Sequence, residues 1–295
     1  MDARTRLVPP GSAETFVASG GGVFRVLRGE SEGSGTPILL VHGGGSDNAA
    51  ISWYRLIAEF ARGRRVIAPD LPGFGYTAHV RLARSAAGMA DQLAELLDRL
   101  QIDRVIVCGV SMGGEVVLQF ALRHPERVEA VVAIAAGGLI EQWRGPLAHR
   151  LAWIGTLIPD PALIPMTALA NRFVRSMINT MVRDPSTLPD VVVEEFAAEA
   201  RRPRSGYAYS LYTRASIDRR RMTNNLLPRI HEIAAPTLLF HGADDPLVDP
   251  SGSKTAARLM PHARLDLVPD CGHWAQLEHH DRFLRTVTEF LVAPP

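Results

Sequence analysis

Short runs of aliphatic and β-branched residues alternate with longer segments of helical periodicity along most of the chain. Six such runs occur, at residues 37–42, 65–70, 103–110, 127–136, 235–241 and 263–268. The segments 85–100 and 112–124 between them repeat apolar residues at helical spacing. This alternation is typical of βαβ units and predicts an α/β fold with a mostly parallel sheet. Near the N-terminus, residues 15–17 and 23–27 are expected to form an antiparallel hairpin at the sheet edge.

The segment 139–235 interrupts this rhythm, because it has no strand pattern and contains several prolines. Structureless loops longer than about 12–15 residues are uncommon in compact domains, so several short helices are expected here. We predict a helical cap at 139–235, inserted into a core made of residues 1–138 and 236–295. The aromatic and Met residues of this cap are expected either to pack its helices or to line a pocket beneath it.

Composition limits the classes of partner. The chain has 295 residues, and its 32 Lys and Arg against 31 Asp and Glu give a formal charge of +1. The chain is therefore not expected to bind nucleic acid or a membrane through a broad electrostatic field. The expected partners are a small-molecule substrate and possibly a second copy of the chain in a homodimer. The two cysteines cannot form a disulfide framework. The N-terminal stretch 1–14 lacks the apolar core of a signal peptide, so a cytoplasmic location is expected.

One serine lies between a predicted strand and a predicted helix, in the pentapeptide Gly109-Val-Ser-Met-Gly113. In a G-x-S-x-G turn, the strained backbone exposes the serine Oγ at the top of the sheet. The glycines make room for this turn, and the N–H groups at the helix start stabilise negative charge on the substrate. Because Gly and Ser also occur together in ordinary loops, the flanking strand and helix carry the prediction that Ser111 is a nucleophile.

A serine nucleophile needs a base, and the base needs an acid that orients it. In this architecture the chain order is Ser, acid, His, each at the carboxyl end of a strand. Asp245 follows the run that ends at His241, and His273 follows the run that ends at Val268. We predict a Ser111–His273–Asp245 triad. The neighbouring Asp244 is the alternative acid, and Asp245 is preferred by its spacing from the end of the strand.

Two backbone N–H groups are also required to bind the oxyanion of the tetrahedral intermediate. Met112, directly after the nucleophile, supplies one. The second is assigned to Gly44, in the glycine-rich stretch after the first parallel strand, and Gly43 allows the substrate to approach closely. His42 is expected to orient this loop. The remaining histidines lack metal-ligand spacing, so we expect neither a metal nor a cofactor.

Several motifs together resemble the α/β-hydrolase superfamily. They are His42-Gly-Gly-Gly, Asp70-Leu-Pro-Gly-Phe-Gly, Gly109-Val-Ser-Met-Gly-Gly and Cys271-Gly-His-Trp-Ala-Gln-Leu-Glu-His. The last motif is similar to that of the meta-cleavage-product hydrolases, which split a carbon–carbon bond in ring-fission dienoates. The resemblance implies an eight-stranded sheet, a substrate-flanking role for Trp274 and a part for Gly44 in the oxyanion site.

The cap departs from that subfamily. The resemblance implies a cap arginine that grips the dienoate carboxylate, but Glu195-Phe196 stands where arginine and an aromatic residue are expected. Arginines 201, 202 and 204 are possible substitutes or ordinary surface residues. We therefore expect a serine esterase acting on a hydrophobic or aromatic ester through an acyl-enzyme. The alternatives are a carbon–carbon hydrolase or perhydrolase with the same triad, and a binding protein that has lost catalysis.

Overall fold

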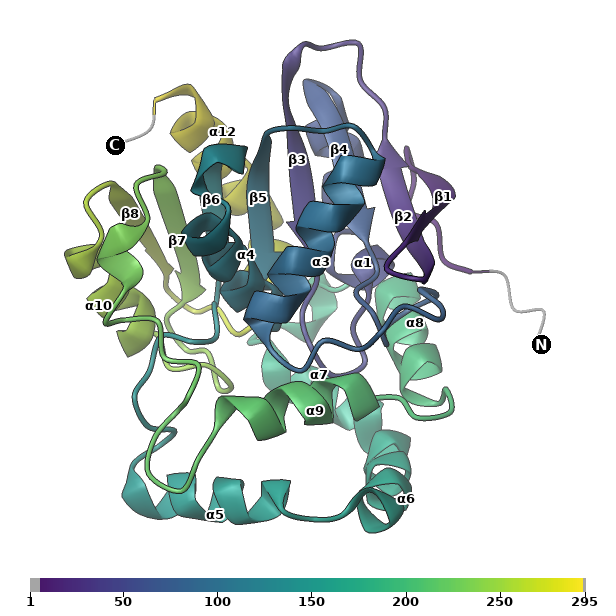
Figure 1. Ribbon diagram of the computed structural model, residues 1–295, viewed down its shortest axis with the longest axis vertical. Helices are drawn as coiled ribbons and strands as arrows, with labels where there is room; N and C mark the ends of the chain where they lie inside the picture. The colour runs from purple at the N-terminus through teal and green to yellow at the C-terminus, as the bar shows by residue number, and fades with distance from the viewer. Residues whose placement is uncertain (1–5, 294–295) are drawn as a thin grey trace.

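The computed structural model, which describes residues 6–293, contains an eight-stranded sheet in the order β1-β2-β4-β3-β5-β6-β7-β8 (Figure 1). The strands are β1 (Ala13–Ser19), β2 (Gly22–Gly29), β3 (Gly35–Val41), β4 (Arg64–Pro69), β5 (Val105–Val110), β6 (Val128–Ile134), β7 (Thr237–Gly242) and β8 (Ala263–Val268). Strands β3 to β8 pair in parallel, whereas β2 pairs antiparallel with both β1 and β4. The predicted fold class and the edge hairpin are confirmed.

Helices cover both faces of this sheet. They are α1 (Ala49–Ser52), α2 (Leu56–Ala61), α3 (Ala86–Arg99), α4 (Met112–Arg123), α10 (Ser251–Leu259), α11 (Ala275–Glu278) and α12 (His280–Val292). Alternate residues of β3 face opposite sides: Ile38 and Leu40 join one buried cluster, with α1, α2 and α12, and Leu39 joins the other, with α3 and α4. Because both faces are buried, the parallel strands read as continuous apolar runs in the sequence.

The connection from β6 to β7 contains helices and no strand in the structure. These helices are α5 (Pro146–Thr156), α6 (Asp160–Ala170), α7 (Val174–Met181), α8 (Asp190–Ala200) and α9 (Tyr207–Ser216). They gather at one end of the sheet, with α5 and α6 farthest from it (Figure 1). We call residues 139–235 the cap segment, and its treatment as a unit separate from the core stays a prediction.

The chain order of the strands reverses between β3 and β5, which lie side by side although β4 flanks β3 on its other edge. In open α/β sheets, ligands bind in the crevice at such a switch point, outside the carboxyl ends of the strands. The loop after β3 holds the glycine-rich stretch, and the turn after β5 holds Ser111. The topology therefore brings these two features together at one edge of the sheet.

The sequence leads us to expect neither a signal peptide at the N-terminus nor a helix that spans a membrane. Residues 1–5, part of the stretch expected to lack a signal peptide, lie outside the described structure. Between residues 6 and 293, none of the helices combines the length and the apolar character needed to cross a bilayer.

Candidate active site

Ser111 occupies a strained turn between β5 and α4. Its φ of 57° and ψ of −117° are unusual for a residue with a side chain. Both flanking residues must be glycine because neighbouring backbone leaves no room for a side chain. A Cβ at Gly109 would lie 2.2 Å from the Gly113 carbonyl oxygen, and one at Gly113 would lie 2.3 Å from the Val41 carbonyl oxygen. The turn thus has the geometry that the sequence motif predicts, and Ser111 lines a cavity.

His273 and Asp245 meet beyond the ends of β8 and β7. The Nδ1 atom of His273 lies 2.7 Å from Oδ2 of Asp245, while Oδ1 accepts the N–H groups of Leu247 and Val248. Burial would raise the pKa of Asp245, but the two histidines that face it and the backbone donors hold that pKa well below its usual value. Asp245 therefore remains ionised at neutral pH and is the acid, rather than Asp244, that reaches the imidazole.

A second buried histidine, which the sequence analysis did not assign to the site, holds Asp245 from the other side. Nε2 of His241 lies 3.2 Å from Oδ2 of Asp245 and 3.1 Å from the Val248 carbonyl, and Nδ1 lies 2.8 Å from the Ser253 hydroxyl. Two acceptors at Nε2 assign the proton to that nitrogen, so His241 donates to Asp245 and accepts from Ser253. The signal for this role was present in the sequence, since His241 ends a predicted strand four residues before the acid.

The candidate site is a cavity of about 530 Å³ between the sheet edge and the cap segment. Ser111, His273, Gly43, Gly44 and Trp274 all line it, so the structure brings these predicted site residues together. Asp245 and the Met112 side chain lie outside the lining: Asp245 acts on the cavity only through His273. The cap supplies an apolar wall with two methionines and two aromatic rings, namely Met177, Met181, Phe196 and Tyr209.

The glycine-rich loop is held by Asp47, a buried residue that the sequence analysis did not single out. Its carboxylate accepts the Gly43 N–H at 2.9 Å, the Asn48 N–H at 2.8 Å and the Ser52 hydroxyl at 2.5 Å. Burial raises the pKa of Asp47, and these hydrogen bonds oppose that rise. Because the Gly43 N–H is committed to Asp47, this glycine is not an oxyanion donor.

Gly44 and Met112 remain as donors. Among residues 6–293, the Gly44 N–H has no hydrogen-bond partner, and Met112 begins α4, so its N–H has no partner within the helix. His42, which is buried, donates from Nδ1 to the Gly43 carbonyl and accepts the Leu71 N–H at Nε2. The expected loop-orienting role of His42 thus agrees with its contacts.

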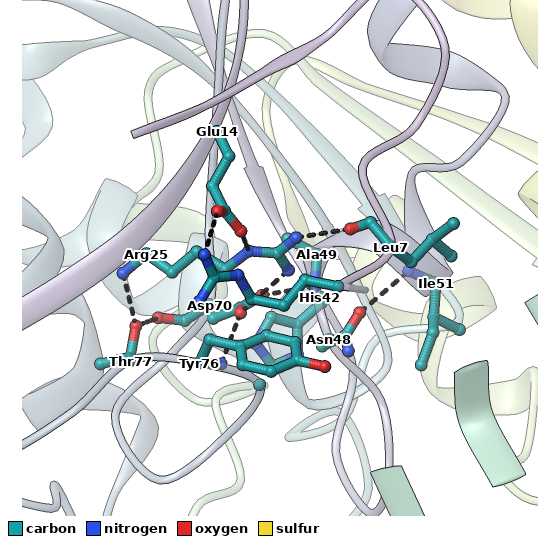
Figure 2. Close-up of polar contacts among 12 residues, drawn as sticks. Leu7, Glu14, Arg25, His42, Asn48, Ala49, Ile51, Asp70, Tyr76 and Thr77 are labelled. Carbon is teal, nitrogen blue, oxygen red and sulfur yellow. Dashed lines mark hydrogen bonds and ion pairs between the residues drawn. The ribbon is translucent and has the colours of Figure 1, made fainter. Parts of the chain in front are cut away.

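A buried ion cluster fixes the chain that follows the glycine loop (Figure 2). Asp70, directly after β4, accepts the N–H groups of Ala49 and Tyr76 at 2.9 and 2.8 Å. Its Oδ2 also lies 3.3 Å from Arg25, whose Nε donates to Glu14 at 2.6 Å. Asp70 therefore connects the start of α1, which follows the glycine loop in the chain, to the β1–β2 edge of the sheet.

The cap rests on the core through Glu115, one helical turn after Ser111. This buried carboxyl accepts the Tyr212 hydroxyl and, at 2.6 Å, the Asn224 side-chain amide. Burial raises its pKa to about 7, against the effect of those hydrogen bonds. Tyr212 stacks on Tyr209 at 5.7 Å between ring centroids, and a Cβ on Gly44 would lie 2.3 Å from the Tyr209 ring. Glu115 thus positions the ring that covers the oxyanion loop.

Glu195, which stands where the resemblance implied an arginine, faces the core. It accepts the Asn48 side-chain amide at 3.2 Å and is not among the cavity-lining residues. Its neighbour Phe196 lines the cavity and packs edge-on against Trp274 at 5.3 Å. In the structure, as in the sequence, this position therefore supplies no arginine to the cavity.

The expected substitutes do not line the cavity either. Arginines 201, 202 and 204 are absent from the lining, and Arg202 pairs with Glu199 at 3.0 Å. Arg214 does line the cavity, but its guanidinium is committed to Asp160 and to the carbonyls of residues 156 and 158. Among the described residues, the cavity thus presents no arginine without a partner.

Comparison with known proteins finds hydrolases by family profile, by sequence and by structure. A family profile described as the alpha/beta hydrolase fold matches residues 36–280. The chain is 31% identical to a 2-hydroxy-6-oxo-2,4-heptadienoate hydrolase of Pseudomonas putida, covering 88% of this chain and 91% of that protein. It is 32% identical to a 2-hydroxy-6-oxo-6-phenylhexa-2,4-dienoate hydrolase of Burkholderia cepacia, covering 91% and 92%. The solved structure of a hydrolase of the same substrate name from Rhodococcus superposes with a TM-score of 0.76 at 27% identity, covering 96% of this chain and 99% of that one.

Proposed function

The chain belongs to the α/β-hydrolase fold family, and from that membership we propose that it hydrolyses the carbon–carbon bond beside the 6-oxo group of a 2-hydroxy-6-oxo-dienoate. The proposal rests on the sequence similarity to hydrolases of this kind, taken together with the residues that line the cavity. Relatives named for this reaction align over about nine-tenths of both chains, and Ser111 and His273 line one cavity. This replaces the ester as the main expectation, because both curated relatives described above are named as dienoate hydrolases.

The residues of the cavity suit the chemistry. Ser111 would attack the C6 carbonyl while His273 takes its proton, and the N–H groups of Gly44 and Met112 would bind the resulting oxyanion. Collapse of that intermediate breaks the bond between C5 and C6 and leaves an acyl-serine. For this cleavage the substrate must first tautomerise, with its 2-hydroxyl proton moving to C5, because only a saturated C5 can pass the electrons of the C5–C6 bond through the C3–C4 double bond to the C2 carbonyl. The resulting dienolate then takes on its C2 oxygen the proton that His273 removed from Ser111, which yields a 2-hydroxypenta-2,4-dienoate.

Water completes the cycle. His273 would remove a proton from water, which attacks the acyl-serine, and the same oxyanion donors would bind the second tetrahedral intermediate. The carboxylic acid made from C6 and its substituent then leaves, and Ser111 regains its proton. Asp245, ionised by its contacts, would hold the imidazole in the tautomer that this exchange needs.

The shape of the cavity favours an apolar substituent on C6. The cap wall made by Met177, Met181 and Phe196 offers apolar and aromatic contacts on the side of Ser111 away from the sheet. Burial of a phenyl or alkyl group there would remove apolar surface from water, worth roughly 25 cal/mol per Å². A phenyl-substituted dienoate is therefore the first substrate to test.

A second candidate, hydrolysis of a carboxylic ester, is favoured by one observation. An ester has no dienoate carboxylate to bind, and the described cavity offers no arginine without a partner, because Arg214 is committed and Glu195 faces the core. The same triad and oxyanion donors would serve either reaction.

One experiment separates the two candidates. The purified protein is assayed with 2-hydroxy-6-oxo-6-phenylhexa-2,4-dienoate, by loss of the dienoate chromophore, and with nitrophenyl esters of matched acyl size. The proposal predicts a higher kcat/KM for the dienoate, abolished in Ser111→Ala. Efficient turnover of esters with none of the dienoate would reject carbon–carbon hydrolysis and favour the ester.

A further inference from the structure

The outermost helices of the cap expose apolar side chains. In α5 only His149 is buried, and across α6, all of which lies in the described chain, no residue is buried. The large apolar side chains exposed on these helices and the turns after them are Leu147, Leu151, Ile154, Leu157, Met166, Leu169 and Phe173. We call these seven residues the outer cap face. Both helices lie at the end of the molecule farthest from the sheet (Figure 1), and large apolar side chains exposed in one region mark interaction sites in soluble proteins.

Helix α5 is apolar on two sides. Leu147, Leu151 and Ile154 follow one another at spacings of four and three residues, so they share one face, and their side chains are 74%, 61% and 48% exposed. A neighbouring side of the same helix contributes Ala152 and Gly155 to the cavity lining. A helix that is apolar on more than one face is expected in a buried or lipid-facing place.

The charge of this region is positive. Between residues 143 and 182 the chain has four arginines and a single acidic residue, Asp160, which pairs with Arg214 at 2.5 Å. Arg150 and Arg172 are exposed, and within the described residues neither has an acidic partner within 4 Å. The apolar face is thus accompanied by exposed, uncompensated positive charge.

Charge decides between two possible occupants of this face. In a two-fold dimer the same surface is repeated on both partners, so a second copy would bring arginines to arginines. An anionic lipid surface is complementary instead, because it accepts apolar side chains below the headgroups and attracts Lys and Arg at their level. Loss of apolar surface from water and attraction of charge then act together.

We propose that the outer cap face lies on the surface of an anionic phospholipid bilayer. The chain-wide charge of +1 argued against a membrane partner, but it averages a basic, apolar cap against an acidic remainder. In this orientation one helix, α5, separates the lipid from the catalytic cavity. The inference rests on the surface alone and holds for either reaction at the active site.

Vesicle flotation tests the proposal. The full chain is mixed with vesicles of phosphatidylcholine and phosphatidylglycerol, or of phosphatidylcholine alone, and the bound fraction is measured. The variant Leu147→Gln/Leu151→Gln/Leu157→Gln changes side chains that do not line the cavity, and Leu259→Gln on α10 is a matched exposed leucine outside the cap. Each lost leucine is expected to lower partitioning to mixed vesicles by about tenfold, and Leu259→Gln to leave it unchanged.

A second variant tests the charge. Arg150→Gln/Arg172→Gln is expected to lower binding to phosphatidylglycerol vesicles by about fivefold for each arginine, and to have no effect on pure phosphatidylcholine. Unchanged melting temperature and unchanged turnover of a soluble substrate establish that both variants are folded.

Three results would overturn the proposal. The first is that the wild-type chain does not float with anionic vesicles, and the second is that the triple leucine variant floats as well as the wild type. The third is a dimer in sedimentation equilibrium that the triple variant dissociates, with no vesicle binding, which would assign the face to a second copy of the chain.

Discussion

Replacing Glu115 with glutamine tests how the cap is held on the core. The carboxyl is fully buried and contacts Tyr212 and Asn224, two polar groups of the cap segment. Glutamine keeps the size and one carbonyl acceptor of glutamate but carries no charge at any pH. The substitution therefore removes the cost of ionising a buried group while leaving most of the contact in place.

The magnitude follows from the pKa of Glu115, which burial raises from 4.5 to about 7. Below pH 4.5 the carboxyl is protonated in both the folded and the unfolded protein, so it gives no pH dependence. Between pH 4.5 and about 7 only the unfolded chain ionises, so the free energy of unfolding falls as pH rises, by about 3 kcal/mol in total. Above about pH 7 both states are ionised and the loss levels off.

Urea unfolding at about pH 5 and about pH 8 measures this effect for the wild type and for Glu115→Gln. Glu199 on α8, whose pKa burial also raises to about 7, remains in both proteins, so its contribution cancels in the comparison. Because the unfolded carboxyl is already mostly ionised at pH 5, the stability of the variant relative to the wild type is expected to rise by about 2.5 kcal/mol from the lower to the higher pH. A stability difference that does not change with pH would refute the account of Glu115 as a buried carboxyl that is ionised at a cost.

The remaining predictions concern the triad and the glycine loop. Asp245→Asn removes the carboxylate that orients His273, and kcat is expected to fall by about 10⁴ with circular dichroism unchanged; a fall below tenfold would contradict the role of Asp245. Gly44→Ala places a Cβ 2.3 Å from the Tyr209 ring, so the loop or the ring must move and the Gly44 N–H is displaced from the oxyanion; kcat is expected to fall by about 10² with a small change in KM, and unchanged kinetics would remove Gly44 from the oxyanion site. Asp47→Ala leaves buried donors without a partner, and urea unfolding is expected to show a loss of about 2–3 kcal/mol; a loss below about 0.5 kcal/mol would contradict this.

Much of the catalytic edge could be predicted because parallel strands end at one edge of the sheet. Ser111, Asp245 and His273 were each placed after a strand, and the fold therefore predicted that they lie at one edge. In the structure His273 contacts Asp245, and Ser111 and His273 line the same cavity. The mostly parallel sheet followed from the alternation of apolar runs in the same way, whereas its eight strands were implied by the resemblance to the α/β-hydrolase superfamily. These inferences needed only local patterns and the rule that connects strand order to the site.

The supporting residues could not be found in this way. Asp47 and His241 act through hydrogen bonds whose partners depend on loop conformation, and a sequence pattern does not specify that conformation. Glu115 could be placed one turn after the nucleophile, but its partner Tyr212 comes from a helix of the cap. The cap segment lacks a repeating rule like that of the sheet, so its contacts had to come from the structure.

The chain-wide charge does not describe the surface of the cap, for a related reason. A sum over 295 residues gave +1, whereas the outer cap face combines exposed Leu151 and Phe173 with unpaired Arg150 and Arg172 in the described structure. The partner that a surface binds depends on where charged and apolar side chains lie next to each other. That arrangement is set by the folded structure and cannot be read from a sum of charges.

The most direct test of the proposed reaction is to identify its products by mass spectrometry. The protein is incubated with 2-hydroxy-6-oxo-6-phenylhexa-2,4-dienoate, and the mixture is analysed for benzoate and 2-hydroxypenta-2,4-dienoate. The account predicts equal amounts of the two products from the wild type and neither from Ser111→Ala. An intact dienoate after prolonged incubation with wild-type protein that hydrolyses nitrophenyl esters through Ser111 would contradict it.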